Sequence, residues 1–421
     1  MVVCRIPSRI VPCWLWGAAL LASVPAARAA DCSRPVDSAA CLECALAHDP
    51  RIAAAESDLR EAEALARSAG LWDNPELDVE ALRASSGGAG GSLTAGIRQT
   101  LPLSGSRRWA GKAAGRRAEA SRARLRQVRW EVSAETVLRL VRLRQIGDEV
   151  RLVEQGRALC GQALDRFGKL AFLTDEQEAA RRAFEWSRVA LMVRAQGLRS
   201  ESEDLRDALT ASLGGAAPAV WDFLVSMPAA WPEWPAAVGP VPAVAAARAE
   251  AEAARAEWRR ARTAAWPDLS IGPLVEAGSG SPASWGAGLG LALPLFNRKR
   301  GDVARAAAGV DRAGVALSVA EGAAARRRDL LARRYVETVA RMQEAGPAVR
   351  GGAGELEEFQ ARYLAGRIPA SLVLEVLSRY QEAVDGVHAL ERDAWSALWE
   401  GYALQGLDVV PRLAAAEKER S

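Results

Sequence analysis

Hydrophobic and polar positions along the chain follow two alternating patterns. Long stretches rich in Ala, Glu and Arg carry apolar residues at helical spacing, as at Leu143, Ile146 and Val150, and this spacing predicts helices that pack along their length. Shorter stretches alternate apolar and polar residues, which predicts strands with two unlike faces. The longest helical stretches reach about 50 residues, or about 75 Å, so they exceed the usual length of helices in globular domains.

The same order of elements is predicted twice. Each half should contain a helix, a β-hairpin and then two long helices. The expected helices span residues 42–70, 107–160 and 175–213 in the first half, and 244–265, 301–350 and 355–404 in the second. The expected strands span 75–82, 93–103, 267–277 and 285–295.

A constant offset of 192 residues relates the two halves. It separates Pro102 from Pro294, each within a Leu-Pro-Leu sequence that is followed by a basic cluster and an Ala-rich run. The same offset relates Pro50 to Pro242, Pro75 to Pro267, Leu77 to Leu269 and Gly96 to Gly288. Because Pro and Gly mark places where the backbone must turn or where a helix ends, these matches indicate a tandem duplication.

The chain ends and the join between the halves have their own patterns. Residues 1–29 are typical of a secretory signal peptide, with an apolar run that ends in an Ala-x-Ala cleavage sequence. Two repeats are then expected at 30–213 and 242–410, with a Pro- and Trp-rich linker at 214–241 and a tail at 411–421. Asp31 precedes Cys32, whereas a lipoprotein cleavage sequence would have small apolar residues there, so we expect no lipid anchor. No later run of about twenty apolar residues predicts a transmembrane helix.

The predicted strands separate their residues onto two faces. Strands of about ten residues with one apolar face suit the wall of a membrane β-barrel; the alternative is an amphipathic hairpin packed on a soluble core. Two hairpins supply four strands, whereas a membrane barrel needs at least about eight. Because open sheet edges are not tolerated in lipid, a barrel would have to be shared by several chains. The charged residues of the other, lumen-facing side are Glu76, Asp78, Glu80 and Arg98.

Composition argues against several other classes of function. The net charge is only +3, so nothing calls for a nucleic-acid partner. His48 and His388 are the only two histidines, which makes a Ser-His-Asp or histidine-rich catalytic set improbable. The sequence also has no Gly-rich phosphate loop of the Gly-x-x-x-x-Gly-Lys type. We therefore expect no enzymatic activity and no cofactor.

A cysteine cluster near the N-terminus has two interpretations. Cys41, Cys44 and His48 share one helix face, and with Cys32 they could in principle bind a soft metal ion. The favoured interpretation is a disulfide in an oxidising compartment, from Cys32 to either Cys41 or Cys44. A Cys41–Cys44 disulfide is disfavoured because cysteines one helical turn apart pair poorly. No metal site is therefore expected.

Three stretches together resemble one known family. The sequences ALAHDPRIAAAESDLREAEALARSAGLWDNPELDVE, GLGLALPLFNRKRGDVARAAAGV and ARYLAGRIPASLVLEVLSRYQEAV, in this order after a signal peptide, resemble the outer-membrane efflux factors typified by TolC. The LPLFNRKRG form is most similar to the CzcC-like branch, which serves heavy-metal efflux pumps. The resemblance covers nearly all of the chain after the signal peptide.

This resemblance implies a fold class and a role. The fold would be mainly α with transmembrane β, internally duplicated, in which a homotrimer forms a shared 12-stranded β-barrel continued by a long α-helical barrel. The protein would be a passive exit duct in the bacterial outer membrane, with its helical part in the periplasm. It would work with a periplasmic adaptor and an inner-membrane pump of the resistance-nodulation-division type, and its cargo would be divalent heavy-metal cations.

The resemblance also implies roles for particular residues. Pro102 and Pro294 would mark the junctions from strand to helix, with the basic residues that follow lying near anionic lipid headgroups. The periplasmic tip, expected between residues 351 and 377, would hold the gate. Candidate gate residues are Glu375 and its possible tether partners Arg362, Tyr363 and Arg367.

Three other functions remain open at this point. An exit duct of the same kind could carry drugs or other small molecules. A periplasmic adaptor is also exported and rich in helical hairpins, although one hairpin between other domains would be expected there. A structural coiled-coil envelope protein would explain the helices and leave the alternating strands unexplained.

Overall fold

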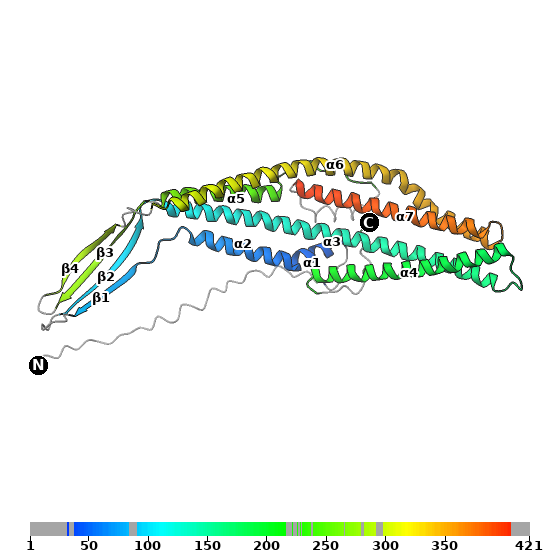
Figure 1. Cartoon of the computed structure of the whole chain (residues 1–421), viewed down its shortest axis with the longest axis horizontal. Helices are drawn as coiled ribbons and strands as arrows, with labels where there is room; N and C mark the ends of the chain where they lie inside the picture. Colours follow the sequence, from blue (N-terminus) through cyan, green and yellow to red (C-terminus); the bar gives the residue numbers. More distant parts are fainter. Residues whose placement is uncertain are drawn as a thin grey trace, which may run out of the picture.

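The structure is a computed structural model of the chain, shown in Figure 1. It describes residues 32, 38–83, 91–215, 221, 225, 228, 230–236, 239–264, 266–278, 282–291 and 298–405. The predicted signal peptide at 1–29, Pro294, the tail at 411–421 and part of the linker at 214–241 lie outside these residues.

Each half of the molecule contains the same succession of helix, hairpin and long helices. The elements of the first half are α1 (Ser38–His48), α2 (Pro50–Ser68), β1 (Glu76–Arg83), β2 (Gly91–Pro102), α3 (Ser106–Phe167) and α4 (Asp175–Ser212). Those of the second half are α5 (Pro242–Thr263), β3 (Asp268–Gly278), β4 (Ser284–Leu291), α6 (Arg300–Leu364) and α7 (Ala370–Leu404). The four strands gather at one end of a long molecule, and the turns between the long helices lie at the other (Figure 1).

The four strands form one antiparallel sheet in the order β1-β2-β3-β4. The two hairpins meet at the central β2–β3 pair, where Thr94 is opposite Glu276 and Leu101 is opposite Leu269. In this sheet β1 and β4 are the two edge strands, and each pairs along one side only.

The helices next to the sheet keep the order of the strands to which they connect. Helix α3 packs between α2 and α5, and α6 packs on α5. Salt bridges join each neighbouring pair: Arg122 of α3 pairs with Glu63 of α2, and Arg124 of α3 pairs with Glu250 of α5. Arg248 of α5 in turn pairs with Glu321 of α6. The helical part therefore extends from the end of the sheet along the long axis of the molecule, with its helices side by side (Figure 1).

The two long hairpins differ in where they turn. Helix α3 has 62 residues and α6 has 65, whereas α4 has 38 and α7 has 35. Both hairpins thus use the same number of helical residues, but the second turns almost one helical turn later along the chain.

Two sequence-based predictions of helix boundaries were wrong. The expected helix at 42–70 is two helices, because Asp49 caps a new helix that has Pro50 in its first turn. The expected break between 350 and 355 is absent, since α6 continues to Leu364. Gly352 lies there because a Cβ atom at this position would come within 2.6 Å of the Tyr380 ring, so the glycine permits close helix packing.

Buried residues form two clusters along the helices. The first cluster is formed mainly by residues of α1, α3, α4, α6 and α7. It includes the stacked rings of Trp395 and Trp399, whose centroids are 5.5 Å apart. Trp231 packs on Trp395 at 5.1 Å between centroids, so the segment between the halves contributes to this cluster. The second cluster runs toward the hairpin turns and is centred on Phe184, which is fully buried.

Candidate functional site

The sheet has one polar face on which charged and very small residues alternate. Because side chains alternate along a strand, the pairing register places Glu76, Arg98, Gly272 and Gly288 in one row across the four strands. Arg98 forms a salt bridge to Asp78, with 2.8 Å between Nη2 and Oδ2. The structure thus places all four predicted lumen-facing residues, which are Glu76, Asp78, Glu80 and Arg98, on the same face of β1 and β2.

A shallow hollow lies on this polar face. Its floor is formed by glycines of three strands, namely Gly96, Gly272 and Gly288, and Arg98 and Asp78 lie at its side. Gly272 has no alternative residue, since a Cβ atom there would lie 1.6 Å from the backbone oxygen of Ile97. The glycines therefore allow close strand packing and also leave space around the Arg98 guanidinium.

The opposite face of the sheet is apolar and largely uncovered. Trp285 is 88% exposed, Leu289 is 73% exposed and Leu77 is 71% exposed. A continuous apolar surface of this kind marks contact with a partner or a membrane. Among the helices of the described residues, none is both long and apolar enough to cross a membrane.

The junctions between strands and long helices use a left-handed residue in both halves. Gly105 precedes α3 with φ 66°, and Lys299 precedes α6 with φ 51°. Pro102 is the last residue of β2, where its missing N–H does not interrupt the ladder. Cations pack on indole rings beside this junction, with Arg107 4.3 Å from the Trp72 centroid and Arg259 4.7 Å from the Trp109 centroid.

The predicted gate residues lie at or beside the second hairpin turn, and the side chains of Glu375, Arg362 and Tyr363 contact residues outside the predicted set. Glu375 is exposed on α7 and pairs with Arg379 at 3.0 Å, and Arg379 also pairs with Glu382. Arg362 pairs with Glu358 one turn earlier on its own helix. Tyr363 is buried against Phe184, with 5.4 Å between ring centroids. The fourth candidate, Arg367, lies in the turn itself, where its N–H donates to the carbonyl of Arg362.

One contact at the hairpin turns was not predicted. Nη1 of Arg166, at the end of α3, donates a hydrogen bond to the carbonyl oxygen of Leu364 at 2.6 Å. This guanidinium satisfies a carbonyl group at the end of α6 and so joins the two turns of the chain. The sequence signal was a basic residue in the last turn of α3, which does not reveal the helix that it caps.

A buried polar network between α3, α4 and α7 was also missed. Nδ1 of His388 lies 2.8 Å from Oε1 of Glu149, and Arg142 binds both Glu149 at 2.7 Å and Glu201 at 2.6 Å. The Gln145 amide donates to the carbonyl oxygen of His388 and to Glu391. Polar residues within the apolar stripe of α3 were the available signal, but the α7 partners of Glu149 and Gln145 are more than two hundred residues away in sequence.

The network changes the titration of its central carboxylate. Burial of Glu149 acts to raise its pKa, but the hydrogen bonds from His388 and Arg142 outweigh burial and lower the pKa to about 2. Burial acts to lower the pKa of Arg142, but its hydrogen bonds to Glu201 and Glu149 and their negative charges outweigh burial and raise the pKa. Glu149 is therefore an ionised group held inside the helical part.

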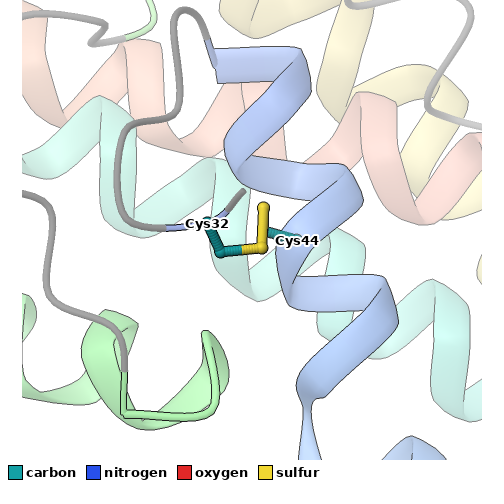
Figure 2. Close-up of a disulfide and its surroundings, with 2 residues drawn as sticks. All are labelled: Cys32 and Cys44. Carbon is teal, nitrogen blue, oxygen red and sulfur yellow. A yellow bond between two sulfur atoms is a disulfide. The ribbon is translucent and has the colours of Figure 1, made fainter. Parts of the chain in front are cut away.

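The N-terminal cysteines form a disulfide between Cys32 and Cys44, shown in Figure 2. Cys41, the alternative partner, is a fully buried free thiol whose pKa is raised to about 12 by burial. Cys44 is thus not available as a thiolate ligand beside Cys41 and His48. Within the part of the chain that the structure describes, no group of three or more His, Cys, Asp or Glu residues is placed to hold a metal ion.

Comparisons with known proteins agree with this architecture. A sequence model of the family described as "Outer membrane efflux protein" matches residues 41–166. The crystal structure of a membrane protein from Pseudomonas aeruginosa is similar at 18% identity and a TM-score of 0.75, covering 89% of this chain and 95% of that chain. The outer membrane protein VceC from Vibrio cholerae is similar at 19% identity and a TM-score of 0.70, covering 87% of this chain and 95% of that chain.

A third similar structure is the CmeC outer membrane channel of Campylobacter jejuni, at 14% identity and a TM-score of 0.74, covering 90% of this chain and 88% of that chain. No curated protein matches the sequence. The chain therefore has the fold of outer-membrane channel proteins such as VceC and CmeC, with the family match limited to its first repeat.

Proposed function

We propose that this protein is the outer-membrane channel component of an efflux system and acts as a passive exit duct. The observation that carries the proposal is the sheet, which has an uncovered apolar face, a polar face and two edge strands that have no outer partner among the residues the structure describes. The sheet connects directly to helices that continue its strand order. The family match and the shared fold with outer membrane channels support this interpretation.

The open edges favour an assembly of several chains, and the resemblance to TolC-type efflux factors implies three. Four strands cannot close into a membrane barrel, whereas three copies supply twelve. In such a homotrimer β1 of one chain would pair with β4 of the next, so no edge would face lipid. The apolar face would then contact the outer-membrane lipid, and the helices would form an α-barrel in the periplasm.

The two repeats and their flanking segments have distinct roles in this proposal. A signal peptide at 1–29 would direct export, and repeats at 30–213 and 242–410 would each supply one hairpin and one set of helices. The linker at 214–241 joins them, and Trp231 packs into the central core. Pro102 and Pro294 would end the strands at the membrane boundary.

Conduction would require partners and no chemistry by this chain. A periplasmic adaptor and an inner-membrane pump of the resistance-nodulation-division type would deliver cargo into the tunnel. The gate would lie at the hairpin turns, where Glu375, Arg362, Tyr363 and Arg367 are the candidate residues. We propose no enzymatic activity, no cofactor and no nucleic-acid partner.

The cargo that we propose is divalent heavy-metal cations, on the resemblance of the LPLFNRKRG sequence to the branch that serves metal efflux. Drugs or other small molecules are the alternative cargo. A deletion strain distinguishes them: sensitivity to zinc, cobalt, cadmium or copper supports the metal assignment. Sensitivity to drugs alone would reject that assignment and leave the duct intact.

The duct itself is tested by location and assembly. We expect the protein in the outer-membrane fraction, and we expect its migration in detergent gels to change on heating. A water-soluble monomer without detergent would contradict the duct and favour a periplasmic adaptor or a structural envelope protein. The four-stranded amphipathic sheet argues against both of those alternatives.

A further inference from the structure

We propose that a hollow between α3, α6 and α7 is a binding site for a small amphipathic organic anion, and that Arg350 binds the anionic group. This helical hollow lies on the long helices, between the sheet and the hairpin turns, and is lined by residues of one chain. It contains none of the candidate gate residues. A passive exit duct requires no such site, so the inference goes beyond the proposed function.

The helical hollow has the size and the apolar wall of a small-molecule site. Its volume is about 330 Å³, within the range of about 300–1,000 Å³ that is usual for such sites. Helix α7 contributes Tyr380, Val384 and Val387 at helical spacing, and α6 contributes Val349. The Tyr380 hydroxyl donates to the Val349 carbonyl oxygen at 3.0 Å, which joins the α6 wall to the α7 wall. The apolar body of a ligand would pack against these side chains.

The charges around the helical hollow favour an anion. Three guanidinium groups and two carboxylates line it. Arg144 forms a salt bridge to Glu391, and Arg151 forms one to Asp148. The third guanidinium, that of Arg350, has no ion pair among the residues that the structure describes. One positive charge therefore remains uncompensated at the hollow, and an anionic ligand would pair with it.

The position of Arg350 on α6 allows it to bind such an anion. A Cβ atom at Gly346, one turn earlier on the helix, would lie 3.2 Å from Nη1 of Arg350, so this glycine leaves room for the guanidinium. Both residues line the helical hollow, and Arg350 is exposed, so a ligand can reach it from solvent. The planar guanidinium can donate two parallel hydrogen bonds to one carboxylate.

A second polar feature of the helical hollow is the pair of Arg144 and Glu391. Nε of Arg144 and Oε1 of Glu391 are buried and have no hydrogen-bond partner among the described residues. Glu391 is 1% exposed, and an unpaired polar group in such a place is unfavourable. A hydroxyl group can donate to the carboxylate oxygen and accept from the guanidinium N–H. The ligand that fits the hollow thus has an anionic group, an apolar body and a hydroxyl group.

The test is equilibrium dialysis of para-hydroxyphenylpropionate against the purified protein at neutral pH, with the same detergent concentration on both sides. Wild-type protein should bind this anion, and it should bind the matched cation tyramine at least about tenfold more weakly. Arg350→Gln should weaken binding of the anion about tenfold, because a hydrogen bond between charged groups is lost. Ala353→Phe should also weaken it, because Ala353 is an exposed lining residue and the larger side chain would fill part of the hollow.

Arg341→Gln provides the matched control. Arg341 is an exposed residue of the same helix that has no ion pair among the described residues and does not line the helical hollow, so its loss should leave binding unchanged. All three changes are at exposed positions, and a thermal midpoint like that of wild type, measured without the probe, checks that each variant is folded. Absence of binding by wild type, equal affinity for the anion and the cation, or equal losses for Arg350→Gln and Arg341→Gln would overturn the inference.

Discussion

The imidazole Nδ1 of His388 on α7 lies 2.8 Å from Oε1 of Glu149 on α3, and both side chains are buried. This contact joins the long helix of the first repeat to the returning helix of the second. Arg142 completes it by binding Glu149 and Glu201, so α4 enters the same network. The two repeats are therefore connected through charged groups inside the helical part, in addition to their packed apolar residues.

Replacing Glu149 should destabilise the protein measurably. In Glu149→Gln the His388 and Arg142 donors lose an ionised acceptor inside the structure, and we expect a loss of about 1–3 kcal/mol of stability. The measurement is the midpoint of denaturant unfolding of the purified protein. Glu154→Gln is the matched control on the same helix, because Glu154 is 40% exposed and pairs with Arg157 and Arg199 at the surface. We expect less than about 0.5 kcal/mol for this control, and equal losses for both variants would contradict a special role of the network.

The same carboxylate predicts a dependence on acid. The pKa of Glu149 is lowered to about 2 in the folded protein from an ordinary value of 4.5, so its ionised form stabilises the folded state above about pH 4.5. That contribution, about 3 kcal/mol at most, is lost as the pH falls from about 4.5 toward 2. Unfolding curves of wild type and Glu149→Gln should therefore converge over this interval. A constant difference between them from pH 6 to pH 2.5 would show that the carboxylate is not responsible.

The disulfide should stabilise the packing of α1 on the rest of the helical part. Removing Cys32–Cys44 with the double variant Cys32→Ser and Cys44→Ser opens a loop of sequence separation 12, and about 3 kcal/mol is expected for a loop of this length. Reducing agent should lower the thermal midpoint of wild type and leave that of the double variant unchanged. Cys41→Ala is the control, because the Cys41 thiol is buried and free. If reductant lowered the thermal midpoint of the double variant as much as that of wild type, a group other than this disulfide would be the source.

Close strand packing in the sheet should depend on one glycine. Gly272→Ala places a Cβ atom 1.6 Å from the backbone oxygen of Ile97, whereas at Gly286 the nearest atom is a Leu274 methyl carbon at 3.8 Å. We expect Gly272→Ala to impair assembly into the heat-modifiable form and Gly286→Ala to assemble like wild type. Normal assembly of both variants would show that the β2–β3 pair is looser than the structure indicates.

Much of this architecture could be predicted from the sequence because local signals agreed with one another. The match of Pro75 to Pro267 and of Gly96 to Gly288 indicated two copies of one unit, and strand alternation predicted the shared face of Asp78 and Arg98. The polar network and the Arg166 cap could not be predicted in this way. The contacts of His388 with Glu149 and of Arg166 with Leu364 join different repeats, so they depend on how the helices pack and not on any local pattern.

The predicted helix boundaries were wrong where one residue type is compatible with two different positions in a helix. The predicted break between residues 350 and 355 includes Gly352, but in the structure this glycine lies within a continuous helix and makes room for Tyr380. Pro50 was placed inside one helix, although it begins α2. At Gly352 the neighbouring helix α7 decides the outcome, and the sequence alone does not identify that neighbour. The Asp49 cap before Pro50 is a local signal that was present in the sequence.

The central claim is that separate chains join at the edge strands, and engineered disulfides test it most directly. Val79 on β1 can be changed to Cys together with Trp285, Ala287 or Leu289 of β4, one pair at a time, because the register of the contact between chains is not known in advance. Within one chain β1 and β4 are separated by β2 and β3, about 14 Å at the usual strand spacing, which is too far for a disulfide. We predict that at least one pair gives covalent dimers and trimers that dissolve with reductant, whereas the single variants do not. Monomers alone from all three pairs, under oxidising conditions in the membrane, would contradict the claim.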